Sequence, residues 1–282
     1  MAASSGDIAR RKTFVIEPSR GPLAFNPREL WEYRELLFFL VWREVRVRYK
    51  QTALGIGWVL LQPLVAMIIF SAIFGQFAKL PSDGLPYPLF VLAGLLPWQL
   101  FAGALTRTGG SLVRDSSLLT KIYFPRLLIP LSAALAGLVD FVLSLVLLVI
   151  MLVYYGVRPG WQLVAIPIFA LLAVLAAIAF GVWLAALNVR YRDVQIALPF
   201  LVQIWFFVSP VAYSASLVSG GISRLVYGLN PMASVIQGFR WSLVGGPGPG
   251  LQLLGATSLI IAVLIAGLIY FRAAEKTFAD VI

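Results

Sequence analysis

Long apolar stretches separated by short charged segments dominate the sequence. A helix that spans the hydrocarbon core of a membrane needs about 20 apolar residues. Stretches of this kind lie between the charged positions at residues 55–77, 88–106, 127–155, 164–188, 194–213 and 251–271. The pattern predicts an all-α integral membrane protein with six transmembrane helices. Six spans place both termini on the same side of the membrane.

The segment at residues 29–50 mixes charges with large apolar side chains. Its apolar positions at helical spacing are Leu30, Tyr33, Leu37, Leu40 and Val41. This spacing predicts an N-terminal amphipathic helix. We expect it to lie in the membrane interface, with Trp31 and Trp42 at headgroup level. A helix packed on a protein partner is the alternative.

The segment at residues 214–250 is apolar but is too short and too interrupted by Gly and Pro to cross a membrane. We expect re-entrant or interfacial outer helices there, between spans five and six. The chain then divides into an N-terminal tail at 1–28, the interface helix at 29–50 and one six-span domain at 51–282. The tail receives no role.

The basic residues are distributed unevenly between the two sides that this topology defines. Of 22 Lys and Arg residues, the few on the side opposite to the termini are Lys79, Arg158, Arg224 and Arg240. Because short loops rich in Lys and Arg stay in the cytoplasm, both termini are predicted to be cytoplasmic. The motif NVRYRDV (residues 188–194) is then a cytoplasmic turn, with Asp193 as N-cap of span five.

The composition supports a membrane location. The chain is 60% hydrophobic and 12% charged, with a net charge of +10, whereas a soluble domain is about 25% charged. In a membrane protein such an excess of positive charge reflects topology and contact with the anionic headgroups of membrane lipids. We therefore expect no nucleic-acid partner.

Several kinds of chemistry are excluded by the residues that the chain lacks. There is no Cys and no His, which removes thiolate nucleophiles and the usual transition-metal ligands. A phosphate-binding loop needs Lys after Gly, and none of the five lysines follows a glycine. We expect no enzyme activity, no metal and no cofactor on this chain. Any ATP hydrolysis then requires another subunit.

Asp140 is the only acid inside a predicted span. Because a charge at membrane depth is costly, it needs an explanation. It pairs with a base in a loop or neighbouring subunit, relays protons, or caps a polar interior. We favour a structural role because no second titratable group lies at that depth nearby in the sequence.

Aromatic residues gather on two predicted spans. Phe70, Phe74 and Phe77 form one stripe of span one, and span five carries Trp205, Phe206, Phe207 and Tyr213. One interpretation is lipid-facing bulk with an interfacial belt. The other is a sugar pathway in which rings stack on sugars while Gln62, Gln203 and Ser209 supply hydrogen bonds.

The loop after span two contains a candidate docking helix. Asp115 and Ser116 are good N-cap residues, and Pro125 ends the helix. Lys121 and Arg126 lie at its end. The alternative is a plain loop that only anchors the topology.

Several blocks resemble one protein family. They are VRVRYKQTALGIGWVLLQPL, GLLPWQLFAGAL, LLTKIYFPRLLIPLS, LNVRYRDVQIALPFLVQIWFFVSPVAY and LNPMASVIQGFRW. In this order, over residues 29–241, they are similar to the membrane (permease) subunit of type-2 ABC exporters for polysaccharides. The O-antigen exporters are the closest subgroup, followed by the teichoic-acid exporters. Capsule exporters are also similar, but QTALGIGW favours the O-antigen type.

The resemblance implies the assembly and the function. Two copies of this chain would form a channel, and two copies of an ABC ATP-binding subunit, which hold ATP and Mg, would sit beneath. The substrate would be an undecaprenyl-diphosphate-linked polysaccharide that crosses the bacterial inner membrane. A proton-coupled flippase that uses Asp140 is the alternative from another class.

The resemblance also assigns roles to residues. The implied channel lining, on spans one and five, is Trp58, Gln62, Phe70, Phe74, Phe77, Gln203, Phe206, Phe207 and Tyr213. The candidate positions for coupling to the ATPase are Ser116, Leu119, Lys121, Tyr123, Arg126, Arg190, Arg192 and Asp193. Arg46, Arg48 and Lys50 would attract the lipid diphosphate at the cytoplasmic entrance, although topology alone also explains these bases.

Overall fold

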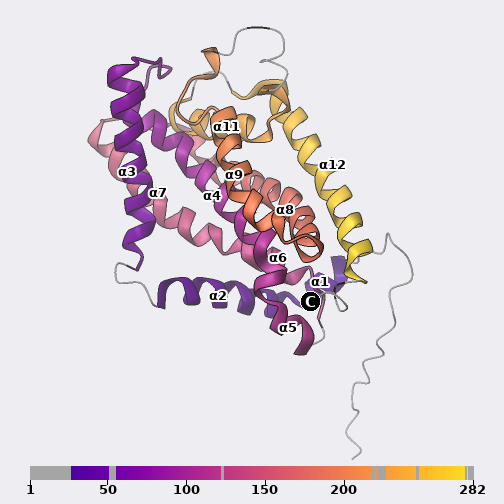
Figure 1. The fold of residues 1–282 in the computed structure, drawn as a ribbon. Coiled ribbons are helices and arrows are strands. Elements are labelled where there is room, and N and C mark those ends of the chain that lie inside the picture. Colours follow the sequence, from indigo (N-terminus) through magenta and orange to yellow (C-terminus); the bar gives the residue numbers. More distant parts are fainter. Residues whose placement is uncertain are drawn as a thin grey trace, which may run out of the picture.

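The computed structural model describes residues 27–50, 55–121, 124–217, 220, 227–245, 248–276 and 278. Every regular element in this part of the chain is a helix (Figure 1). The prediction of an all-α protein is therefore confirmed for the described residues.

Helices long and apolar enough to cross a membrane number five in the described residues. They are Gly57–Phe77 (α3, Gly57–Phe70, continued by the π-helix η1, Ser71–Phe77), Tyr87–Arg114 (α4), Leu128–Tyr154 (α6, Leu128–Leu135, and α7, Gly137–Tyr154), Trp161–Arg190 (the 3-10 turn η2, Trp161–Ala165, and α8, Ile166–Arg190) and Gly250–Glu275 (α12). These correspond to predicted spans one, two, three, four and six.

Predicted span five is shorter than the sequence pattern indicated. Helix α9 covers Asp193–Val208, 16 residues, so the predicted end at Tyr213 was wrong. Ser209 leaves the helix with an extended ψ of 143° because the ring of the following Pro210 disfavours helical backbone before it. Asp193 as N-cap was also wrong. It is the first residue of α9, and Arg192 occupies the cap position without a side-chain hydrogen bond.

Helix α4 is longer than predicted. We expected it to end at Thr106, but it continues through Arg107 to Arg114. Both arginines remain in the helix because carboxylates meet them: Asp140 lies 3.8 Å from Arg107, and Glu44 lies 2.9 Å from Arg114. Positive charges that we assigned to a loop thus belong to the end of the central helix.

The predicted interface helix consists of two pieces, α1 (Pro27–Glu32) and α2 (Arg34–Lys50), with a break at Tyr33. Helix α2 lies across one end of the bundle, near the short helix α5 (Ser116–Lys121) (Figure 1). Its inner face packs on the core through Leu37 and Leu40, two of the predicted apolar positions, and Leu40 is only 4% exposed.

The core is centred on α4, which is largely buried and packs most extensively on α8 (Figure 1). Close contact between these helices depends on small residues. A Cβ at Gly181 would lie 2.6 Å from the Thr108 side chain. At the end opposite to α2 lies α11 (Pro231–Val244), capped by Asn230, whose side chain accepts from the Met232 N–H at 3.0 Å.

Candidate functional site

A cavity of about 400 Å³ lies between α3, α4 and α7. One face of α3 supplies Val59, Gln62, Ala66 and Phe70 to its wall. These residues share a face because their spacing follows the helical repeat. Since a helix rises 1.5 Å per residue, this lining extends for about 16 Å along α3. The cavity is therefore elongated along the bundle.

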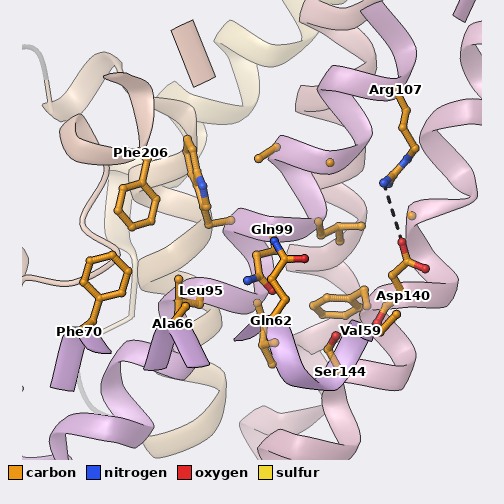
Figure 2. A pocket seen from close by; sticks show the side chains of 17 residues that line it. Val59, Gln62, Ala66, Phe70, Leu95, Gln99, Arg107, Asp140, Ser144 and Phe206 are labelled. Carbon is orange, nitrogen blue, oxygen red and sulfur yellow. Dashed lines mark hydrogen bonds and ion pairs between the residues drawn. The ribbon is translucent and has the colours of Figure 1, made fainter. Parts of the chain in front are cut away.

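The end of the cavity nearest α2 is charged. Asp140 of α7 accepts hydrogen bonds from Arg48 and Tyr49 of α2, and it forms an ion pair with Arg107 of α4 at 3.8 Å. Figure 2 shows the Arg107 guanidinium directed at this carboxylate. Burial, and after it the hydrogen bond to Asp140, raises the pKa of Tyr49 to about 12, so the phenol remains a donor at neutral pH.

The structural role favoured for Asp140 stays a prediction, and its contacts show which bases it meets. Its bases come from α2 and α4, so it pairs with distant parts of its own chain. Gly137, on the same helix as Asp140, makes room for one of them: a Cβ there would lie 2.3 Å from Nη2 of Arg107.

Amide and aromatic side chains line the rest of the cavity. Gln62 of α3 and Gln99 of α4 line the cavity between its charged and aromatic ends (Figure 2). Phe70 and Phe206, with ring centroids 5.5 Å apart, close the far end together with Trp98, whose ring is 5.6 Å from Phe206. Along the cavity the lining thus changes from charged to amide to aromatic.

The predicted channel residues are only partly brought together. Phe70, Phe74, Phe206, Phe207 and Tyr213 line a second cavity of about 50 Å³ beside the first. The predicted members outside both cavities are Trp58, Phe77 and Gln203. All three side chains are exposed, Phe77 to 84%.

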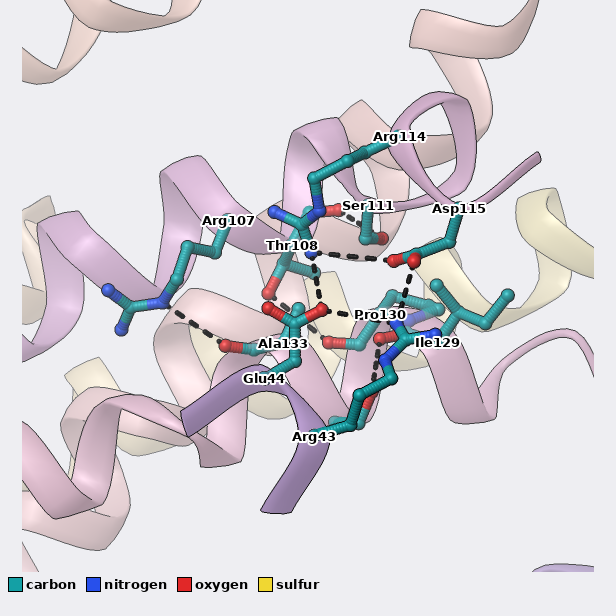
Figure 3. Close-up of polar contacts among 11 residues, drawn as sticks. Arg43, Glu44, Arg107, Thr108, Ser111, Arg114, Asp115, Ile129, Pro130 and Ala133 are labelled. Carbon is teal, nitrogen blue, oxygen red and sulfur yellow. Dashed lines mark hydrogen bonds and ion pairs between the residues drawn. The ribbon is translucent and has the colours of Figure 1, made fainter. Parts of the chain in front are cut away.

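Four charged residues join α2 to the junction of α4 and α5 (Figure 3). Arg43 pairs with Asp115 at 2.6 Å, and Arg114 pairs with Glu44 at 2.9 Å. The side chains of Glu44 and Asp115 are each only 13% exposed. Because each acid also lies within 3.5 Å of the second arginine, the four residues form a closed network that fixes α2 to the start of α5.

The predicted coupling residues occupy several places at this end. Ser116, Leu119 and Lys121 belong to α5, and Tyr123 lies outside the described residues. Arg126 donates to the Glu275 carbonyl at 2.8 Å, which ties it to the end of α12.

The predicted turn at residues 188–194 is shorter in the structure, because α8 continues to Arg190 and α9 begins at Asp193. The Arg190 guanidinium lies 5.4 Å from the Tyr191 ring centroid, and Arg192 immediately precedes α9. Asn188 is buried and donates to the Gly109 carbonyl of α4 at 3.1 Å. The last turn of α8 is therefore fixed to α4.

The three predicted entrance bases differ in their surroundings. Arg46 is exposed, with its guanidinium 5.6 Å from the Trp42 ring centroid, and Lys50 is exposed at the end of α2. Arg48 binds Asp140 instead and is only 27% exposed.

Sequence reasoning missed Arg107 and Gln99 as parts of the site. Both were readable in principle, because residues 99, 103 and 107 recur every four positions and share one face of a helix. Gly103 also leaves space there, since a Cβ at this position would lie 2.9 Å from Nη1 of Arg107. Assigning Arg107 to a loop concealed this face.

Residues 35–244 match the model of the family described as the ABC-2 type transporter. The chain belongs to the ABC-2 type transporter membrane family. The resemblance noted in the sequence blocks is thereby confirmed. Membership also agrees with several apolar helices and with a multi-pass membrane protein.

Relatives in this family have export names. The chain is 33% identical over 256 residues to the O-antigen export system permease protein RfbA of Myxococcus xanthus, covering 90% of this chain and 97% of the relative. It is 28% identical over 251 residues to RfbA of Klebsiella pneumoniae, with 88% and 95% covered. It is 26% identical over 244 residues to the polysialic acid transport protein KpsM of Escherichia coli, with 83% and 91% covered.

Proposed function

We propose that this chain is the channel-forming permease of an ATP-driven exporter that moves undecaprenyl-diphosphate-linked polysaccharide of the O-antigen type across the bacterial inner membrane. The similarity to O-antigen export permeases along nearly the whole chain carries this proposal. The cavity lined by charged, amide and aromatic side chains supports it, because these groups suit a phosphate and a sugar.

The exporter would contain two copies of this chain and two ABC ATP-binding subunits, which bind ATP and Mg. The absence of a Gly-Lys pair in the sequence supports a separate ATPase. Helix α5 would dock on it, and the Arg43–Asp115 and Arg114–Glu44 pairs would transmit its displacement into α2.

In the membrane, α9 would form a short fifth span between the long helices. Both termini would then face the cytoplasm, with α2 in the cytoplasmic interface and α11 as a re-entrant helix at the outer side. The distribution of Lys and Arg supports this orientation. The exposed aromatic residues Trp31 and Trp42 on the outer surface of α1 and α2 support an interfacial position.

The glycan pathway would follow the aromatic cluster between η1 and α9. Phe70 and Phe206 lie at the boundary of the two cavities, where their rings present apolar faces to a sugar. Arg46 and Lys50, exposed on α2, would attract the lipid diphosphate at the entrance.

The second candidate is export of a capsular or teichoic-acid polysaccharide, favoured by the similarity to KpsM. Identity to the RfbA proteins is higher in two organisms, which favours the O-antigen type. A proton-coupled flippase is less well supported because Asp140 is held by Arg48 and Arg107.

Deletion of the gene followed by complementation tests the function. We expect surface polysaccharide to disappear and lipid-linked glycan to accumulate at the cytoplasmic face. The wild-type gene should restore export, and an ATPase should copurify with the restored permease.

Phe206→Ala should reduce export several-fold. The matched control is Phe200→Ala on the same helix, because Phe200 is 64% exposed and outside both cavities. Unchanged surface polysaccharide after deletion would refute the proposed function.

A further inference from the structure

The charged end of the α3–α4–α7 cavity contains more positive than negative charge. Arg48 and Arg107 converge on the single carboxylate of Asp140. The neighbouring acid on α2, Glu44, is already paired with Arg114 at 2.9 Å. An arginine pair that shares one carboxylate retains attraction for a further anion.

Arg107 points its charge into the cavity. Among the described residues, its hydrogen bond is the one from Nε to the Ala133 carbonyl at 3.3 Å, which fixes the plane of the guanidinium. Nη1 is 3.8 Å from Asp140, longer than a hydrogen bond. With 21% of its side chain exposed, Arg107 can meet a ligand that enters the cavity.

The cavity has the size of a headgroup site. Its volume of about 400 Å³ is at the lower end of small-molecule pockets, roughly 300–1,000 Å³, and is too small for a polymer. From Arg107 the lining continues through Gln62 and Gln99 to Phe70 and Phe206 (Figure 2). A phosphate followed by one sugar matches this order of groups, with amides for hydroxyls and rings for the sugar face.

We propose that this cavity binds the diphosphate and first sugar of the lipid-linked substrate, with Arg107 as phosphate ligand and Asp140 as the counter-ion that the phosphate displaces. This inference rests on the proposed function and adds a site beyond the entrance bases. In the empty chain Asp140 neutralises part of the arginine charge. A diphosphate carries more negative charge and more acceptor oxygens than one carboxylate, so it competes for both guanidinium groups.

If the phosphate displaces Asp140 from Arg107, substitutions of these two residues should affect the affinity differently. Substituting the acid removes the competitor, whereas substituting Arg107 removes the ligand. The two changes should therefore move the affinity for a diphosphate in opposite directions. A purely structural ion pair predicts that both changes weaken binding or leave it unaltered.

The test uses the purified permease–ATPase complex in nanodiscs, with farnesyl diphosphate as a short-chain probe and calorimetric binding constants. We expect Arg107→Gln to weaken binding about tenfold or more, as for loss of a charge-assisted hydrogen bond, and Arg107→Lys to weaken it less. Asp140→Asn should tighten binding several-fold. Arg34→Gln, at an exposed arginine of α2 that donates to the Trp31 carbonyl, should leave it unchanged. Only complexes that remain monodisperse are compared.

Wild-type affinity in Arg107→Gln, or weaker binding in a monodisperse Asp140→Asn complex, would overturn the site. Inorganic diphosphate and phosphatidylglycerol serve as further probes. If either binds as tightly as farnesyl diphosphate, the site selects free phosphate or ordinary lipid, and the assigned ligand is wrong. The proposed function is tested separately by the deletion strain: intact export with Arg107→Gln refutes this site and leaves the exporter in place.

Discussion

Arg107 and Arg240 occupy opposite ends of the bundle and are held by different partners. Arg107 faces a cavity and the carboxylate of Asp140. Arg240 on α11 is buried and donates to the carbonyls of Val211, at 2.6 Å, and Phe90, at 3.3 Å. Its guanidinium also lies 3.6 Å from the Phe90 ring centroid. Among the described residues, no carboxylate lies within ion-pairing distance of Arg240.

The different partners give the two arginines different roles: Arg240 anchors the fold, and Arg107 belongs to the proposed ligand site. Backbone carbonyls and an aromatic ring are fixed parts of the scaffold, so Arg240 ties α11 to α4 and to the segment after α9. A carboxylate on a side chain can give way to a stronger anion. The chemical nature of the partner, rather than the depth of the arginine, therefore decides whether it stabilises the fold or binds a ligand.

The largest expected effect is the loss of stability on substituting the anchor. Arg240→Ala should destabilise the complex by about 3 kcal/mol, because the Val211 carbonyl loses its partner and a void replaces the guanidinium. Arg107→Gln should cost only about 1 kcal/mol. The guanidinium is partly exposed, so water in the cavity can solvate the groups that it leaves. Thermal unfolding of the two purified variants compares them. Equal losses would remove the distinction between anchor and site.

A smaller effect is expected from crowding the anchor without touching it. A Cβ at Gly94 of α4 would lie 2.6 Å from the Val211 carbonyl oxygen and 2.8 Å from Nη2 of Arg240. Since the carbonyl belongs to the backbone, Gly94→Ala should destabilise by about 2 kcal/mol.

The matched control lies on the same helix. A Cβ at Gly110 would meet nothing within 4 Å, so Gly110→Ala should be neutral or stabilising by up to about 1 kcal/mol. Unfolding temperatures in one detergent measure both. A Gly94→Ala variant as stable as Gly110→Ala would mean that Val211 and Arg240 are free to move.

The smallest effect is expected at the exchangeable end. Tyr49→Phe removes one hydrogen bond to Asp140 and should cost about 1 kcal/mol or less. The same thermal measurement detects it. A loss as large as that of Arg240→Ala would show that Asp140 is held as rigidly as the anchor, contrary to its proposed displacement.

The long helices were predictable to within a few residues at most ends, because lipid imposes a length and an apolar composition on each of them. The end of α9 was also encoded, since Ser209 precedes Pro210, but the apolar pattern continued past it and concealed the break. The end of α4 was missed for the opposite reason: Arg107 reads as a water-facing residue until its partner is known.

The site was less accessible to sequence reasoning than the fold. The cost of a lone acid in lipid indicated that Asp140 needs a partner, yet Arg48 is separated from it by 92 positions. No local pattern connects them. The cavity arises only where α3, α4 and α7 pack together, and the aromatic stripe alone did not distinguish Phe70, which lines it, from the exposed Phe77.

The shortness of α9 has a consequence for the surrounding bilayer. With 16 residues it rises about 24 Å, less than the roughly 30 Å of a typical hydrocarbon core. Lipids meet a short span by shortening their own layer. As the fifth span of an exporter, α9 would therefore thin the membrane beside the aromatic cluster and reduce the depth of hydrocarbon that a polar headgroup must cross. The export rate would then depend on the acyl-chain length of the surrounding lipids.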